Sequence, residues 1–162
     1  MKRTIFYSSL LFISFSLTAQ EGNIKWWNPA DNDFKVIEGQ AWPNEIAAFY
    51  DRFPATAEAV VRQPVWNLSR HSAGLIIRFR SNASEIRVRY KLKGNIAMPH
   101  MPATGVSGLD LYSKNSDGQW LWNKGAFSFG DTTTYNFRNI RPNDKYHKKG
   151  KEYQLYLPLY NS

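Results

Sequence analysis

Residues 85–93, Glu-Ile-Arg-Val-Arg-Tyr-Lys-Leu-Lys, decide the fold class, because they alternate strictly between apolar and charged side chains. A period of two puts one kind of side chain on each face of an extended chain, so this stretch predicts a half-buried β-strand. The preceding run, residues 74–80, is β-branched and aromatic, and residues 81–84 between the two runs favour a turn. The two runs are therefore predicted to pair as a hairpin.

Further strands are predicted on both sides of this pair, over residues 34–38, 109–113, 119–122, 133–138 and 153–160. Turn residues occupy positions 115–118 and 141–144. Only residues 54–61 favour a helix, with Pro54 near its start and Pro64 as its expected end. Short strands, few helical segments and many aromatic residues (6 Trp, 9 Tyr and 10 Phe) predict an all-β, antiparallel sandwich or jelly roll forming a single domain.

The first residues have the pattern of an export signal. Lys2 and Arg3 precede an apolar run over residues 5–17 and small residues at 16–19, which predicts a signal peptide over 1–19, cleaved near Ala19 and Gln20. A stable membrane anchor is disfavoured, because it needs about 20 apolar residues and this run is shorter and interrupted by serines. The mature domain is expected to span 20–162 and to be periplasmic or extracellular. The chain has no cysteine, which rules out disulfide bonds and a lipid-modified cysteine.

The chain is basic, with a formal charge of +8 that becomes +6 without Lys2 and Arg3. Nucleic-acid binding is not expected, since no recognition motif accompanies the charge. Basic side chains alternate along the predicted strands, which favours one solvated sheet face. These residues are Arg78, Arg80, Arg87, Arg89, Lys91 and Lys93.

Catalytic candidates are scarce. The chain has three histidines, His71, His100 and His147, and it lacks both a Gly-Asp-Ser-type nucleophile turn and a Gly-x-Ser-x-Gly elbow. Ser69 and His71 have the residue types of a nucleophile and a base, but they would have to lie within hydrogen-bond reach in an open cleft. The wide spacing of the histidines predicts no metal site, and no cofactor is implied.

Tryptophans offer a second class of site. Trp120 and Trp122 are two apart on a predicted strand and therefore share a face, where they belong either to the core or to a platform that stacks on sugar rings. Trp66 is expected to pack internally. Trp26 and Trp27 are expected to hold the lead-in segment, residues 20–33, against the domain.

A loop rich in Pro and Gly, residues 98–112, runs into Gly108-Leu-Asp-Leu-Tyr112. Together with residues 52–58, 65–74 and 156–160, in this order, it resembles the N-terminal domain of secreted bacterial SGNH (GDSL-type) esterases, which bears the name of the GxDLY motif. The sequence Thr18-Ala19-Gln20 is similar to leader ends in exported proteins of Bacteroidetes-type bacteria.

The resemblance implies a jelly-roll-like domain that precedes an α/β SGNH catalytic domain, in esterases many of which remove acyl groups from glycans. The family's nucleophile, oxyanion-hole residues and acid–histidine pair belong to that second domain, and no position here matches them. The chain alone is therefore not expected to hydrolyse esters, and its expected partners are the missing catalytic domain and an acylated glycan.

Three hypotheses follow. The first is an accessory domain that supports the catalytic domain or the substrate cleft. The second is a stand-alone carbohydrate-binding module that uses Trp120 and Trp122, and the third is a hydrolase built on Ser69 and His71. An alternative for the motif loop is that it only bridges two sheets. The candidate interface or cleft residues are Met98, His100, Met101, Gly105, Gly108, Asp110 and Tyr112.

Overall fold

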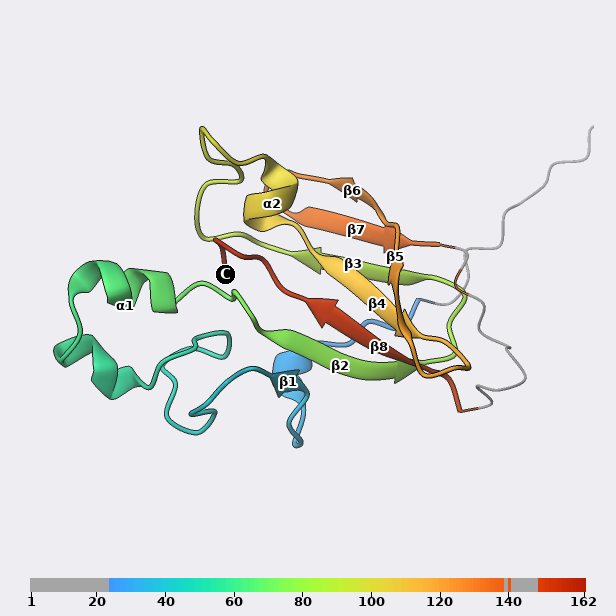
Figure 1. Ribbon diagram of the computed structural model, residues 1–162, viewed down its shortest axis with the longest axis horizontal. Helices are drawn as coiled ribbons and strands as arrows, with labels where there is room; N and C mark the ends of the chain where they lie inside the picture. Colours follow the sequence, from blue (N-terminus) through green and yellow to red (C-terminus); the bar gives the residue numbers. More distant parts are fainter. Residues whose placement is uncertain (1–23, 139, 141–148) are drawn as a thin grey trace, which may run out of the picture.

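A computed structural model of the chain describes residues 24–138, 140 and 149–162. In this part of the chain, eight strands form two antiparallel sheets that pack face to face as a β-sandwich (Figure 1). The five-stranded sheet has the order β1-β2-β8-β4-β5, and the three-stranded sheet has the order β3-β7-β6. The strands are β1 (Ile37–Glu38), β2 (Ile76–Ser81), β3 (Ile86–Tyr90), β4 (Asp110–Lys114), β5 (Trp120–Asn123), β6 (Ala126–Ser128), β7 (Thr133–Phe137) and β8 (Lys151–Tyr156).

The core lies between the sheets and combines aliphatic and aromatic side chains. In the five-stranded sheet, Ile77, Leu155 and Leu111 lie side by side across β2, β8 and β4, and each is at most 4% exposed. They pack against buried Tyr135 and Phe137 of β7. Each such side chain contributes about 1.5–3 kcal/mol by leaving water, so this row is a main source of stability. The all-β sandwich predicted from the sequence is confirmed.

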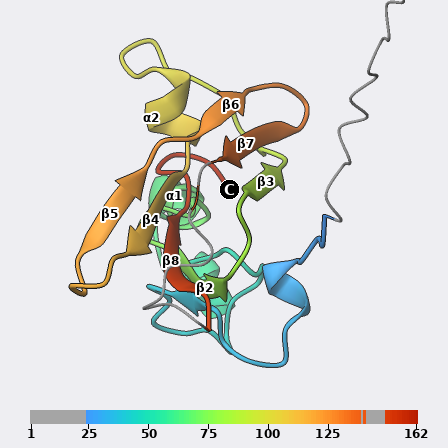
Figure 2. The ribbon, with the colours of Figure 1, turned by 90° about the vertical axis from the view of Figure 1, so that its right-hand side faces the viewer.

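The predicted hairpin between residues 74–80 and 85–93 is wrong. β2 pairs with β1 and β8, whereas β3 pairs with β7 in the other sheet (Figure 2). The residues between the two strands cross from one sheet to the other. Alternation specifies which face of a strand is buried, but it does not specify the neighbouring strand. The basic side chains Arg78, Arg80, Arg87 and Arg89 are exposed as expected, but the first two lie on one sheet and the last two on the other.

The helical segments also differ from expectation. Residues 54–61 form only the 3-10 helix η2 (Ala55–Ala59), and Pro64 does not end a helix but is the second residue of α1 (Gln63–Ser69). Proline is tolerated there because the first helical turn needs no backbone N–H. A third helical segment, α2 (Ala103–Ser107), lies in the motif loop, and a short 3-10 helix, η1 (Pro29–Asp31), lies near the start. No helix in the described part is long and apolar enough to span a membrane.

Several local expectations are confirmed. Trp66 is 4% exposed, and the lead-in segment contacts the domain through the Trp27 ring, 6.0 Å from the Phe79 ring. The turn at 115–118 closes with a hydrogen bond from the Gly118 amide to the Asn115 carbonyl, 3.1 Å long. The strand β6 was not predicted. The predicted turn at 141–144 and His147 lie outside the described residues.

Candidate functional site

The motif loop connects β3 of one sheet to β4 of the other, so it bridges the two sheets. Its tip is a tight turn in which the Met98 amide donates to the Met101 carbonyl (3.0 Å) and the Met101 amide donates to the Met98 carbonyl (3.1 Å). His100 lies exposed at this tip, while both methionines are half-buried. Met101 packs over Gly105, where an added Cβ would lie 2.9 Å from the methionine Cγ. The two methionines therefore form no large exposed apolar patch.

Gly108 occupies a close approach between the loop and the three-stranded sheet. A Cβ at this position would overlap the Thr104 carbonyl oxygen and would lie 2.9 Å from the Tyr135 hydroxyl. Burial raises the pKa of Tyr135, although a hydrogen bond from the Leu109 backbone opposes this shift. Leu109 and Leu111 of the motif enter the core. The glycine and the two leucines of the signature thus serve the packing of the sandwich.

The other two signature residues, Asp110 and Tyr112, point the opposite way. They lie on the outer face, which we define as the side of the five-stranded sheet turned away from the three-stranded sheet. Asp110 is exposed and accepts a hydrogen bond of 2.9 Å from the indole nitrogen of Trp122. Tyr112 meets Tyr156 edge to face, with ring centroids 5.4 Å apart. No packing inside the sandwich requires these two side chains.

The sequence left open whether Trp120 and Trp122 are core or surface, and the structure places both on the outer face. Trp122 lies opposite Tyr112 in the strand pairing and is 56% exposed. Trp120 is half-buried, because the Arg78 guanidinium and the Lys114 ammonium each lie 5.8 Å from its ring centroid. Arg78 comes from β2, three strands away in the sheet order, so the Trp120 ring and the Arg78 side chain extend toward each other across the face.

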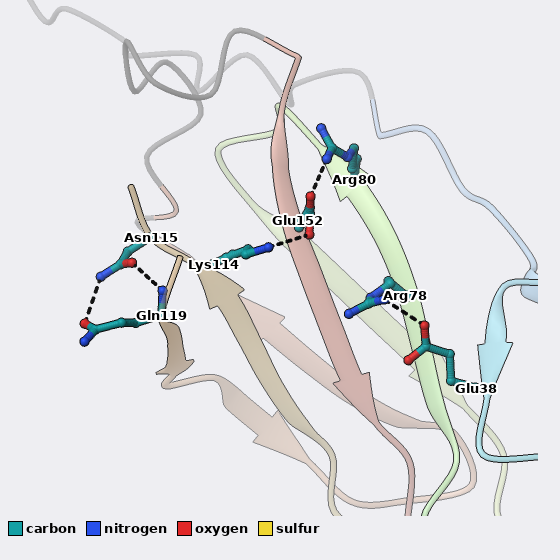
Figure 3. A network of polar contacts seen from close by, with 7 residues as sticks. All are labelled: Glu38, Arg78, Arg80, Lys114, Asn115, Gln119 and Glu152. Carbon is teal, nitrogen blue, oxygen red and sulfur yellow. Dashed lines mark hydrogen bonds and ion pairs between the residues drawn. The ribbon is translucent and has the colours of Figure 1, made fainter. Parts of the chain in front are cut away.

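Ion pairs neutralise the rest of the outer face (Figure 3). Arg78 contacts Glu38 at 2.9 Å. Glu152 pairs with Arg80 and also with Lys114, the latter at 3.5 Å. Partial burial raises the pKa of Glu152, but Lys114 and Arg80 outweigh this and hold it below the ordinary value. This carboxylate is therefore ionised near neutral pH and links β8 to its two neighbours.

Asn161 joins the end of the chain to the motif loop, and sequence reasoning missed it. It is 1% exposed. Its side-chain oxygen accepts from the amides of Lys93 (3.1 Å) and Gly94 (2.8 Å), while its nitrogen donates to the Asn95 carbonyl (3.0 Å) and the Ser107 hydroxyl (3.1 Å). An asparagine at position 161 of this sequence carries no pattern that marks it as buried.

Ser72, which follows α1, reaches the same place. Its hydroxyl oxygen lies 2.9 Å from the Pro158 carbonyl oxygen and 2.8 Å from the Asn161 carbonyl oxygen, and it donates to these two acceptors. The segment after α1, the loop after β3, α2 and the last residues of the chain are therefore tied together at one end of the sandwich. Figure 1 shows the C-terminus at this end.

Ser69 and His71 do not form a nucleophile and base. Ser69 is the last residue of α1, is 2% exposed and donates its hydroxyl to the Trp66 carbonyl at 2.7 Å. The His71 ring lies against Tyr160 instead, with centroids 6.3 Å apart. Partial burial, with the nearby Arg52, lowers the pKa of His71. Within the described residues, the two side chains share no hydrogen bond, and no group of three or more His, Cys, Asp or Glu could hold a metal ion.

Comparison with known proteins agrees with this geometry. A search of the curated proteins found no match. Among solved structures, the chain is similar to a GDSL-like lipase from Bacteroides ovatus ATCC 8483, with 28% sequence identity and a TM-score of 0.66. The similarity covers 78% of this chain and 35% of that one, so the chain spans well under half the length of that protein.

The family comparison covers almost the whole described chain. The family model for GxDLY, the N-terminus of SGNH-hydrolase-type esterases, matches residues 24–162. The matched range contains the motif loop, the outer-face residues Asp110 and Tyr112, and Asn161. This chain belongs to the GxDLY family of N-terminal domains of SGNH-type esterases.

Proposed function

We propose that this chain is the accessory N-terminal domain of an exported SGNH-type esterase that acts on acylated glycans, and that it supports the catalytic domain. The family match over residues 24–162 carries the proposal. In this proposal residues 1–19 are a signal peptide, the mature domain spans 20–162, and ester hydrolysis belongs to the catalytic domain. The acyl group and the glycan would be recognised next to that domain's nucleophile.

The end of the sandwich that holds Asn161 is the place where we expect the catalytic domain to dock. Four exposed apolar side chains lie on the segments that meet there: Leu68 (50% exposed), Ile96 (36%), Leu159 (51%) and Tyr160 (39%). Tyr160 is held in place, since its amide donates to the Val106 carbonyl at 3.0 Å. Exposed apolar groups of this kind mark protein contacts.

Among the candidate interface residues of the motif loop, Gly105 and Gly108 support this end from within, since both allow α2 to pack closely. Met98, His100 and Met101 form the adjacent loop tip. We expect these five residues to act by shaping the docking end rather than by touching the reacting ester.

A chimera tests the proposal. Residues 24–162 would replace the corresponding domain of the Bacteroides ovatus GDSL-like lipase, and hydrolysis of p-nitrophenyl acetate and the melting temperature would be compared with those of its catalytic domain alone. We expect the chimera to be more stable and more active, and a Leu159→Asp chimera to lose both gains. A chimera no better than the isolated catalytic domain, in an enzyme that needs its own N-terminal domain, would contradict the proposal.

The outer face favours a second candidate, a stand-alone carbohydrate-binding module. Its specific support is the exposed Trp122 ring, whose nitrogen is held by Asp110. The two candidates differ in one respect that can be measured, because a stand-alone module binds polysaccharide without any catalytic domain.

A further inference from the structure

We propose that the outer face of the five-stranded sheet is a binding site for an uncharged glycan chain, centred on Trp122, Asp110, Tyr112 and Tyr156. Strand pairing places these residues on neighbouring strands, with Asp110 opposite Tyr156 and Tyr112 opposite Trp122. No described helix lies over this side of the sheet (Figure 1). The site is formed by this chain alone and does not depend on the catalytic domain.

The aromatic rings are held in fixed positions before any ligand arrives. The hydrogen bond to Asp110 fixes the edge of the Trp122 indole, although the ring is 56% exposed. Tyr156 is 38% exposed and meets Tyr112 edge to face. Apolar faces of sugar rings stack on such surfaces, and a ring that is already ordered loses little entropy on binding.

Two polar side chains lie among the rings on neighbouring strands, Asp110 on β4 and Gln154 on β8. Trp122 donates to one carboxylate oxygen of Asp110, Oδ1, which leaves the second oxygen of this exposed carboxylate to accept from ligand hydroxyls. Gln154 lies between Arg78 and Tyr112 in the strand pairing, and its side-chain amide can both donate and accept hydrogen bonds. The aromatic rings can stack on the C–H faces of sugar rings, and the side chains of Asp110 and Gln154 can form hydrogen bonds with the sugar hydroxyls.

The charges of the face indicate that the ligand is uncharged. At the paired positions of the described strands, three cations (Arg78, Arg80 and Lys114) are matched by three anions (Glu38, Glu152 and Asp110). The first three are engaged with the first two anions in ion pairs. The formal charges at these strand positions therefore cancel, so the positions give no net attraction for an acidic polymer.

A protein partner suits this face less well than it suits the end of the sandwich that holds Asn161. The exposed aliphatic side chains Leu68, Ile96 and Leu159 lie on the segments around Asn161. By contrast, the only aliphatic residue that strand pairing places on the outer face of the described strands is Ile76, which is half-buried. A mixture of aromatic rings and paired charges without exposed aliphatic groups points to a sugar.

The test uses the purified chain and native gel electrophoresis through gels that contain xylan, glucomannan or polygalacturonate. Intrinsic tryptophan fluorescence would be titrated with oligosaccharides of any polymer that retards the protein. We expect at least one of the two neutral polymers to retard it and to perturb the fluorescence. Trp122→Ala should weaken binding by about tenfold, as expected for the loss of one stacked ring.

Trp42→Ala is the matched control. Trp42 is 44% exposed, but it lies between β1 and η2 with its ring against Phe53, at 6.4 Å. Its removal should leave binding unchanged. Asp110→Ala should weaken binding as Trp122→Ala does, because it frees the indole and removes an acceptor. Circular dichroism and the melting temperature would establish that each variant is folded.

Three results would overturn the proposal: no retardation by either neutral polymer, equal losses in Trp122→Ala and Trp42→Ala, or binding confined to polygalacturonate and removed by salt. Protection of Trp122 from a fluorescence quencher by an SGNH catalytic domain, with no effect of neutral glycans, would assign the face to that domain instead. Failure of the glycan test would leave the accessory role intact, because the chimera experiment measures a gain in activity and stability that depends on Leu159 and not on Trp122.

Discussion

The side-chain nitrogen of Asn161 donates a hydrogen bond of 3.1 Å to the hydroxyl of Ser107, which itself donates to the Ile96 carbonyl at 2.9 Å. This contact joins the last residues of the chain to α2 in the motif loop. It lies in the interior, where both Asn161 and Ser107 are at most 1% exposed. The direction in which the chain leaves the sandwich is therefore set by the same loop that carries the family motif.

Replacing Asn161 with alanine should destabilise the domain by about 3 kcal/mol or more, because several buried polar groups would lose their partner at about 1–3 kcal/mol each. Urea unfolding followed by tryptophan fluorescence would measure the change. Asn161→Asp keeps the acceptor but loses both donated bonds, so it should also destabilise the fold. A loss below about 1 kcal/mol in both variants would mean that water replaces these bonds.

Gly108→Ala should be severely destabilising or prevent folding, because the new methyl group would overlap the Thr104 carbonyl and press on the Tyr135 hydroxyl. Overpacking of this kind costs about 1–3 kcal/mol or more. The control is Gly130→Ala, where the nearest atom to a new Cβ is 3.9 Å away. Thermal unfolding of both variants gives the comparison, and equal melting temperatures would contradict the close approach at Gly108.

Asp51→Ala should destabilise the domain by about 2–3 kcal/mol, since this buried carboxylate pairs with Arg70 at 2.9 Å and accepts from the Ala48 amide at 2.9 Å. The exposed pair between Glu38 and Arg78 provides the contrast, because surface pairs contribute about 0–1 kcal/mol. Glu38→Ala should therefore change the unfolding free energy much less than Asp51→Ala. A similar cost for both would show that burial of Asp51 adds nothing.

Acid should weaken the outer face through Glu152. Its pKa in the folded protein lies below the ordinary value of 4.5, so the unfolded chain binds the proton first as the pH falls. The stabilisation is complete above about pH 4.5 and is lost as the pH drops through the folded pKa. Glu152→Gln should reduce the loss of unfolding free energy on acidification. The reduction should be less than about 1 kcal/mol, because the ion pairs are partly exposed. An unchanged acid limb would show that the pairs with Lys114 and Arg80 contribute no stability.

Local patterns were enough to predict most strands. The alternation of Ile86, Val88 and Tyr90 with arginines identified β3, and the shared face of Trp120 and Trp122 was confirmed. Whether that shared face was buried could not be predicted, because aromatic residues serve equally in cores and on binding surfaces. Strand pairing decided the matter by placing the two rings opposite Lys114 and Tyr112 on the outer side of the sheet.

Contacts between distant residues could not be read from the sequence. Pairing of β2 with β8 joins Ile77 to Leu155, and a nearby turn at residues 81–84 favoured the wrong partner, β3. The role of Pro64 was missed for a related reason, since proline both ends one helix and begins the next. Pro64 begins a helix because the residues that follow it, up to Ser69, are helical.

The sequence by itself determined the class of fold, the inward or outward direction of side chains along each strand, and the family, because these depend on local periodicity and on short motifs. The tertiary structure alone decided which strands are neighbours, that Asp110 holds Trp122, and that Asn161 closes the end beside α2. The physical reason is that hydrogen bonds and ring contacts across strands depend on which distant segments share the core, and that choice minimises the exposed apolar surface and the unpaired polar groups of the whole chain at once.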